Sequence, residues 1–221
     1  MKYTINVRRT THWLLLAAVF STLVGMQIHG SAKVDTIAHA IQQDTTTKPY
    51  AELKSQDSPA ANTGALRAQI AITEYNKGVR EATPNCNCGK DVFRYTGGVA
   101  TQWCAAFATW VANEAGTPVA NPSTGSWRFI NSQKLLAELK SQGKFYTKDD
   151  IKSGSTTPQV GDLVFFWRGS TAEELGHVDI IVAVHNNGTA DLVGGNVNNA
   201  VSYRKSFPYM NSYGFQGIAR P

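Results

Sequence analysis

One cysteine stands at the start of an apolar segment and is the first candidate for chemistry. The segment Thr101–Val111 contains Cys104 followed by small and aromatic residues, and Gly116 is a typical helix stop. If Thr101 is the N-cap, Cys104 takes the third helical position, where unpaired N–H groups and the helix dipole stabilise a thiolate. A lowered thiol pKa is what a nucleophile needs. The alternative is a cysteine that packs as a small apolar side chain.

A cysteine nucleophile needs a base, and two histidines follow it in the folded part of the chain. His177 and His185 lie eight residues apart on one predicted strand, roughly 26 Å at 3.3 Å per residue, so they cannot share a site. His185 borders a turn signal at 186–188. His177 follows Gly176 at the start of the strand and is therefore the predicted base; a purely structural role is its alternative.

The register of the predicted hairpin selects a third group. A two-residue turn would pair Asn186 with Thr189, which places Asn196 diagonal to His177 on the same face of the sheet. Asp191 would then point to the other face and could not orient the imidazole. An odd-length loop or a bulge would reverse this conclusion. The alternative is that Asn196 is only a turn residue.

The order of the surrounding elements predicts an α+β fold. An amphipathic helix runs from about Leu66 to Gly78, the cysteine helix follows, and Ser132 is the predicted cap of a surface helix that stops at Gly143. Strands are predicted at 162–167, 177–184, 190–193 and 201–203. Helices first and strands afterwards predict N-terminal helices packed on an antiparallel sheet, with the cysteine helix at the centre.

Composition divides the chain into three parts. Residues 1–32 combine basic residues, an uncharged run and small residues near Ser31, which is typical of a secretory signal peptide; an uncleaved anchor is the alternative. Residues 33–64 are polar and predict a disordered tether, and residues 65–221 suit one catalytic domain. Without the signal the net charge falls from +5 to +2, because three basic and no acidic residues are removed. No nucleic-acid partner is predicted.

Two further cysteines, Cys86 and Cys88, stand in a turn-rich loop. A bridge between them would leave Cys104 free, as a nucleophile must be. A bridge across one residue is strained, so two loose thiols are the alternative. A metal site is not predicted, because this pair lacks the four ligands of a structural zinc.

Four short motifs give the chain a resemblance to a known family. They are, in order, Gln102–Phe107, Gly161–Phe166, Gly176–Ile181 and Gly194–Asn196. Together they resemble the CHAP family of cysteine, histidine-dependent amidohydrolases/peptidases, over about residues 66–221. The resemblance implies a papain-like fold and cleavage of amide bonds in bacterial peptidoglycan, by an N-acetylmuramoyl-L-alanine amidase or a peptide endopeptidase.

The resemblance also implies roles for single residues. Cys104 would be the nucleophile, His177 the base and Asn196 the residue that orients the histidine. We expect Gln102 to help bind the oxyanion together with the Cys104 N–H, and Tyr95 to border the cleft, with core packing as its alternative. No metal or cofactor is expected, because the acidic calcium-binding loop of some phage-derived relatives is missing before the cysteine.

Two positions depart from the family pattern. Gly194 stands where many members have a glutamate, two residues before the asparagine. Asp179 stands where glycine is common, two residues after the histidine, and its charge is expected to raise the pKa of His177. Neither departure removes the nucleophile or the base.

The expected protein is an exported monomeric enzyme, secreted or periplasmic, that acts on peptidoglycan or its stem peptides. Two alternatives stay open. An interbacterial toxin would apply the same chemistry to a competitor's wall and would be matched by an immunity or inhibitor protein. An inactive wall-binding module would keep the fold without turnover, as Gly194 in place of the glutamate suggests.

Overall fold

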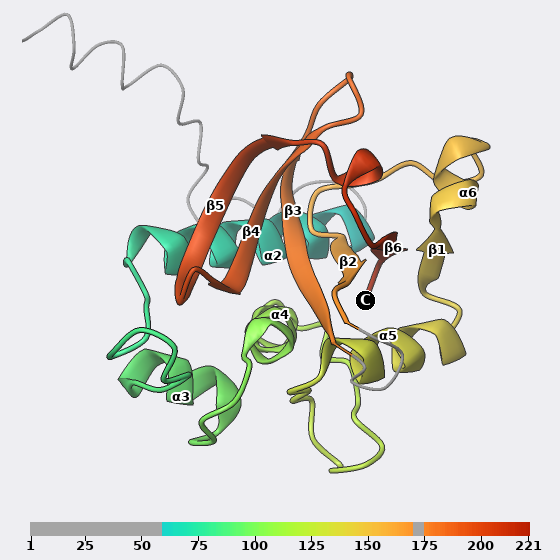
Figure 1. Cartoon of the computed structure of the whole chain (residues 1–221). Helices are drawn as coiled ribbons and strands as arrows, with labels where there is room; N and C mark the ends of the chain where they lie inside the picture. The colour runs from blue at the N-terminus through green and yellow to red at the C-terminus, as the bar shows by residue number, and fades with distance from the viewer. Residues whose placement is uncertain (1–58, 170–174) are drawn as a thin grey trace, which may run out of the picture. The chain divides into compact units, whose positions relative to one another are not determined.

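The computed structural model describes residues 59–169 and 175–221. The predicted signal peptide and residues 33–58 of the predicted tether lie outside the described residues. Among the residues described, no helix is both long enough and apolar enough to span a membrane. Figure 1 shows the strands of one twisted sheet with α2, α3 and α4 beside it.

The sheet has six antiparallel strands in the order β1-β6-β2-β3-β4-β5. They are β1 (Phe145–Thr147), β2 (Leu163–Trp167), β3 (Gly176–Val184), β4 (Ala190–Val197), β5 (Ala200–Phe207) and β6 (Phe215–Ala219). The four predicted strands correspond to β2–β5. The sequence did not predict β1, which has only three residues, or β6, whose Gln216 and Gly217 break an apolar strand pattern.

In the described part of the chain, four helices come before the first strand, in agreement with the α+β prediction, and the short α6 follows β1. They are α2 (Pro59–Asn76), α3 (Lys90–Thr96), α4 (Cys104–Glu114), α5 (Ser132–Ser141) and α6 (Lys148–Lys152), followed later by the short 3-10 helix η2 (Tyr209–Asn211). Residues 59–64 were predicted to belong to the tether but form the first turns of α2. Asn131, not Ser132, caps α5, because its side chain accepts from the N–H groups of Gln133 and Lys134.

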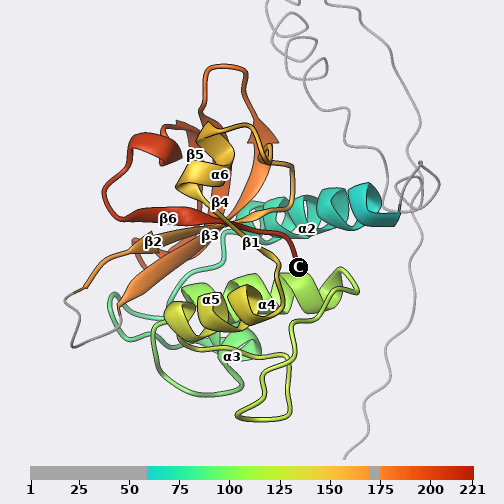
Figure 2. The same ribbon diagram turned by 90° about the vertical axis from the view of Figure 1, so that its right-hand side faces the viewer.

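Helix α4 lies at the centre of the fold, as predicted. Eight of its residues are buried, and it contacts α2, α3, α5, β3 and β4. Figure 2 shows α4 below the sheet with α5 and α3 next to it. Gly195 lets β4 approach this helix closely: a methyl group there would lie 2.6 Å from the Phe107 Cβ and 2.8 Å from the Trp103 ring. The prediction of an α+β fold with a central cysteine helix is confirmed.

The sheet separates two apolar clusters. Val178 and Ile180 of β3 pack with the helices, whereas Ile181 packs in the cluster on the other side, around Tyr209. This alternation follows from the two-residue period of side chains in a strand. His177 and Asp179 therefore project from the same face of β3, which decides the arrangement of the site.

Candidate active site

Cys104 is the first residue of α4 and is 7% exposed. The predicted cap at Thr101 is wrong: Trp103 is the N-cap residue and makes no side-chain cap bond. The reason is that the buried indole of Trp103 donates to Glu81 Oε1 at 3.0 Å, which holds residue 103 in the core with a non-helical backbone. The thiol still lies at the helix N-terminus, where free N–H groups favour an anion.

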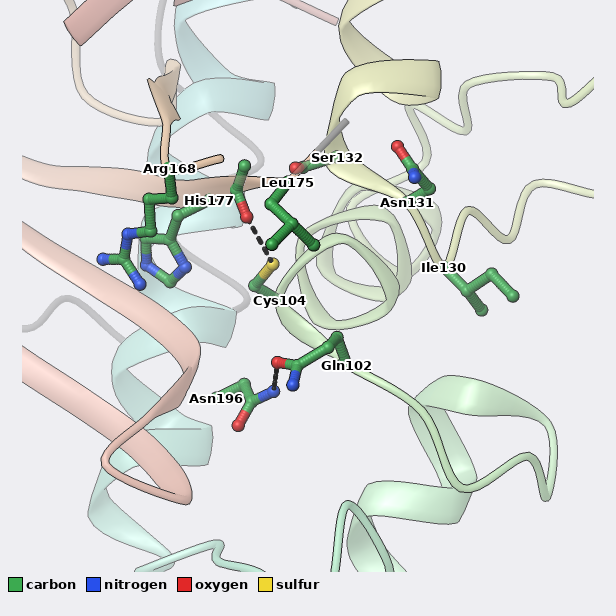
Figure 3. A pocket seen from close by; sticks show the side chains of 10 residues that line it. Gln102, Cys104, Ile130, Asn131, Ser132, Arg168, Leu175, His177 and Asn196 are labelled. Atoms are coloured by element: carbon green, nitrogen blue, oxygen red, sulfur yellow. Dashed lines mark hydrogen bonds between the residues drawn. The ribbon is translucent and has the colours of Figure 1, made fainter. Parts of the chain in front are cut away.

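His177 lines the same cleft as Cys104, which has a volume of about 220 Å³. The Cys104 Sγ lies 4.0 Å from the Gly176 carbonyl oxygen, beside the start of β3. Figure 3 shows Cys104 between His177 and Leu175, with Gln102 to one side. The structure thus brings the two predicted reactive groups together.

The partner of the histidine is Asp179, not Asn196. His177 Nε2 lies 2.8 Å from Asp179 Oδ1, and both side chains are almost fully buried. Since Nε2 is used by this bond, Nδ1 is the ring nitrogen left for Cys104. The other Asp179 oxygen forms an ion pair with Arg204. The Asp179 carboxylate therefore fixes the orientation of the imidazole, and Arg204 in turn holds the carboxylate.

The register of the β3–β4 hairpin also differs from the prediction. His185 N donates to Thr189 O at 3.0 Å, so three residues, not two, form the hairpin loop. A register shift follows between Ile181 and Ala183. The two shifts add up to two residues, so register alone keeps Asn196 on the same face as His177. A second bulge lies between Gly194 and Val197, where Asn196 has a left-handed backbone and its side chain binds Gln102 instead. Asp191 nevertheless does not orient His177, because its carboxylate lies 2.8 Å from His185 Nε2.

Gly194 leaves the space that Asp179 occupies. A methyl group at position 194 would collide with Asp179 Oδ1 and would lie 3.3 Å from His177 Nε2. The two departures from the family pattern are therefore one spatial exchange. A carboxylate on β3 fills the place beside the imidazole that a side chain on β4 would otherwise occupy.

Asn196 and Gln102 both line the cleft but bind each other. Asn196 Nδ2 donates to Gln102 Oε1 at 2.6 Å and to Asn87 Oδ1 at 3.2 Å. Tyr95 does not border the cleft. It is fully buried, donates a hydrogen bond to Glu74 and packs against Trp103. The alternative role of Tyr95, packing in the core, is therefore the correct one.

Cys86 and Cys88 form a disulfide, and Cys104 is free. Of the two possibilities left by the sequence, the bridge is the one that forms. Within residues 59–169 and 175–221, no group of three or more His, Cys, Asp and Glu side chains could hold a metal ion.

The charges around the thiol favour its ionised form. Burial raises the pKa of Cys104, but the His177 side chain and the N–H groups of Val178 and Ala105 lower it, and the net shift is downward. Burial lowers the pKa of His177; Cys104 opposes this, and Arg168 and Arg204 lower it further. The predicted upward shift of the histidine pKa is therefore wrong, because desolvation together with Arg168 and Arg204 outweighs the raising effect of Cys104.

These opposing effects predict how alkylation of Cys104 depends on pH. In the wild type, reaction with iodoacetamide should have a midpoint below about 8.5, the usual cysteine value. In His177→Ala the main lowering group is gone while burial still raises the pKa of Cys104, so the midpoint should move to higher pH. Mass spectrometry over a pH series measures both profiles, since the chain has one free thiol. Identical profiles would mean that His177 does not act on the thiol.

A cysteine at a helix N-terminus, facing an imidazole held by a carboxylate, is the arrangement found in papain-like cysteine hydrolases. The comparison with family models agrees with this arrangement. Residues 94–196 match the CHAP domain family, and the predicted resemblance is confirmed for this part of the chain. CHAP domains are typically hydrolases of the amidase or peptidase type. The match includes Cys104, His177 and Asn196.

One solved structure also resembles this chain, but its similarity in sequence and in fold is low. It is NlpC2 from Trichomonas vaginalis, with 17% sequence identity and a TM-score of 0.40. The match covers 76% of this chain and 50% of that chain, so the present chain spans about half the length of the NlpC2 structure. The comparison with curated proteins found no match.

Proposed function

We propose that the protein is an exported cysteine hydrolase that cleaves amide bonds in bacterial peptidoglycan, as an amidase or a peptide endopeptidase. The observation that carries the proposal is the buried row Cys104, His177 and Asp179 at an open cleft. A structural cysteine would not need a histidine with a fixed tautomer beside it. The disulfide supports export, because such bonds persist in oxidising compartments.

The mechanism follows from the positions of these groups. The Cys104 thiolate attacks the amide carbonyl, and the new oxyanion is bound by the Cys104 N–H and the Gln102 carboxamide N–H. His177, protonated at Nδ1, gives this proton to the leaving amine as the C–N bond breaks. The neutral imidazole then takes a proton from water, whose oxygen displaces the thiolate from the acyl group. Asp179 holds Nε2 throughout.

The shape of the surface supports a polymeric substrate. A second cleft, of about 640 Å³, shares Ile130 and Asn131 with the first and continues past Thr101 and Asn121. Arg168 lines the first cleft, next to the reactive pair. A long groove with a cation near the thiol suits a peptide that carries carboxylates, as stem peptides do.

Gly194 no longer favours an inactive binding module. That alternative rested on the missing glutamate, and the Asp179 carboxylate stands beside the imidazole in its place. The protein therefore keeps a complete set of groups for turnover.

Mass analysis of digested peptidoglycan tests the proposal. An amidase should release intact stem peptides with a new N-terminal alanine, whereas an endopeptidase should release truncated peptides. The amount released should depend on Cys104. If purified oxidised protein releases no fragments from walls of several peptide chemistries, the proposed function is wrong.

A further inference from the structure

The loop between α2 and α3 is closed by the Cys86–Cys88 disulfide and is tied to the start of α4. The N–H of Asn87 donates to Glu81 Oε2 at 2.9 Å. The other oxygen of this buried carboxylate accepts the Trp103 indole N–H at 3.0 Å. One glutamate thus connects the disulfide loop to the residue that precedes Cys104.

The same loop reaches the cleft through side-chain amides. Asn87 Oδ1 accepts from Asn196 Nδ2 at 3.2 Å, and the same nitrogen donates to Gln102 Oε1 at 2.6 Å. The oxygen of the Gln102 carboxamide is therefore occupied. Its Nε2 makes no hydrogen bond within residues 59–169 and 175–221, so it is the donor left for a ligand in the cleft.

Backbone conformation adds to this picture. Asn87 and Asn196 have φ values of 50° and 58°, in the left-handed region that few residues other than glycine adopt. Both asparagines that lead to Gln102 are therefore held in an uncommon conformation, and such residues gather at functional sites. The bridge across Asn87 restricts the backbone at this point.

We propose that the disulfide loop positions the oxyanion donor: it holds Asn87 so that Asn87 and Asn196 orient the Gln102 carboxamide with its N–H groups toward the substrate carbonyl. This inference rests on the proposed function. It makes Asn87 and Asn196 positioning residues for Gln102, and turnover depends on the oxidised loop. The bridge closes a very short loop, so its contribution to the stability of the whole domain is small.

Substitutions of Asn87 test the hydrogen bonds between the side-chain amides of Asn87, Asn196 and Gln102 without removing the disulfide. Asn87→Gly keeps the left-handed backbone but removes the acceptor, and kcat on peptidoglycan fragments should fall about tenfold with KM nearly unchanged, because a misplaced oxyanion donor acts on the transition state. Asn87→Asp keeps an acceptor oxygen and should retain most of kcat. Asn85→Gly, in the same loop and exposed, is the matched control and should behave as wild type.

Alkylation of Cys104 distinguishes an effect on the oxyanion donor Gln102 from an effect on the nucleophile itself. The reaction with iodoacetamide forms no oxyanion, so its rate should be unchanged in Asn87→Gly. In a Gln102→Ala background, Asn87→Gly should cause no further loss of kcat, because both substitutions act on one group. Equal losses in both backgrounds, or slower alkylation in parallel with kcat, would overturn the inference.

Reduction tests the bridge itself. TCEP and water convert the disulfide into two thiols and the phosphine into its oxide, while Cys104 stays a thiol. Wild-type kcat should then fall about as much as in Asn87→Gly, and the Cys86→Ser/Cys88→Ser variant should be equally slow with and without TCEP. Unchanged kcat after complete reduction would refute the role of the loop. Absence of any turnover by the oxidised wild type would instead refute the proposed function.

Discussion

Replacing Cys104 with alanine should abolish the release of peptidoglycan fragments while the domain stays folded. The rate should fall by a factor of about 10,000 or more, because the acyl intermediate forms on the sulfur that this change removes. The change removes one buried sulfur atom, so the free energy of unfolding should change by only about 1 kcal/mol. Fragment release and a thermal unfolding curve measure the two effects.

The serine variant gives the control for Cys104. Cys104→Ser keeps a similar volume and a nucleophilic atom, but the hydroxyl is far less acidic than a thiol, so activity should remain near background. Appreciable hydrolysis by the alanine variant would contradict the assignment of the nucleophile. Loss of folding in both variants would point to a structural cysteine.

The second large effect is expected when the acid beside the histidine is removed or moved. In Asp179→Gly the imidazole loses the group that fixes its tautomer, and kcat should fall about 100-fold or more. Arg204 also loses its buried partner, which lowers stability by several kcal/mol on the scale of about 3–5 kcal/mol for a broken buried pair. Gly194→Ala alone should also lower kcat, because the methyl group collides with the Asp179 carboxylate.

The double variant Asp179→Gly/Gly194→Glu moves the carboxylate from β3 to β4. Since the two positions share one space, it should recover part of the lost kcat and of the lost stability, and it should be better than either single change. Asp191→Asn is the matched control: this carboxylate on β4 binds His185 and Tyr203, away from the cleft, so the variant should keep its kcat. A double variant no better than Asp179→Gly would contradict the exchange.

Much of the fold and the two reactive residues could be predicted from local patterns. The apolar run after Cys104 predicts a buried helix, and α4 has that place. The four strands β2–β5 have the predicted positions, because β-branched and aromatic residues follow one another there between turn signals. His177 was found by elimination, since few histidines follow the cysteine.

The errors arise where contacts between distant residues decide the outcome. The helix begins at Cys104, because Glu81 binds the Trp103 indole across the fold. Tyr95 is buried, because Glu74 of α2 accepts a hydrogen bond from its hydroxyl group. Neither contact leaves a local signal near Cys104 or Tyr95.

The sequence by itself determined the kind of chemistry: a thiol at a helix N-terminus, a histidine at a strand start and an α+β arrangement that brings them together. Only the tertiary structure decided which group holds the histidine and which group Asn196 serves. The physical reason lies in two irregularities of the strands. One additional loop residue and one bulge in the β3–β4 hairpin set Gly194 against Asp179, which leaves room for this carboxylate beside the imidazole. A second bulge between Gly194 and Val197 gives Asn196 a left-handed backbone and its bond to Gln102, and the short-range pattern of the strands does not predict either irregularity.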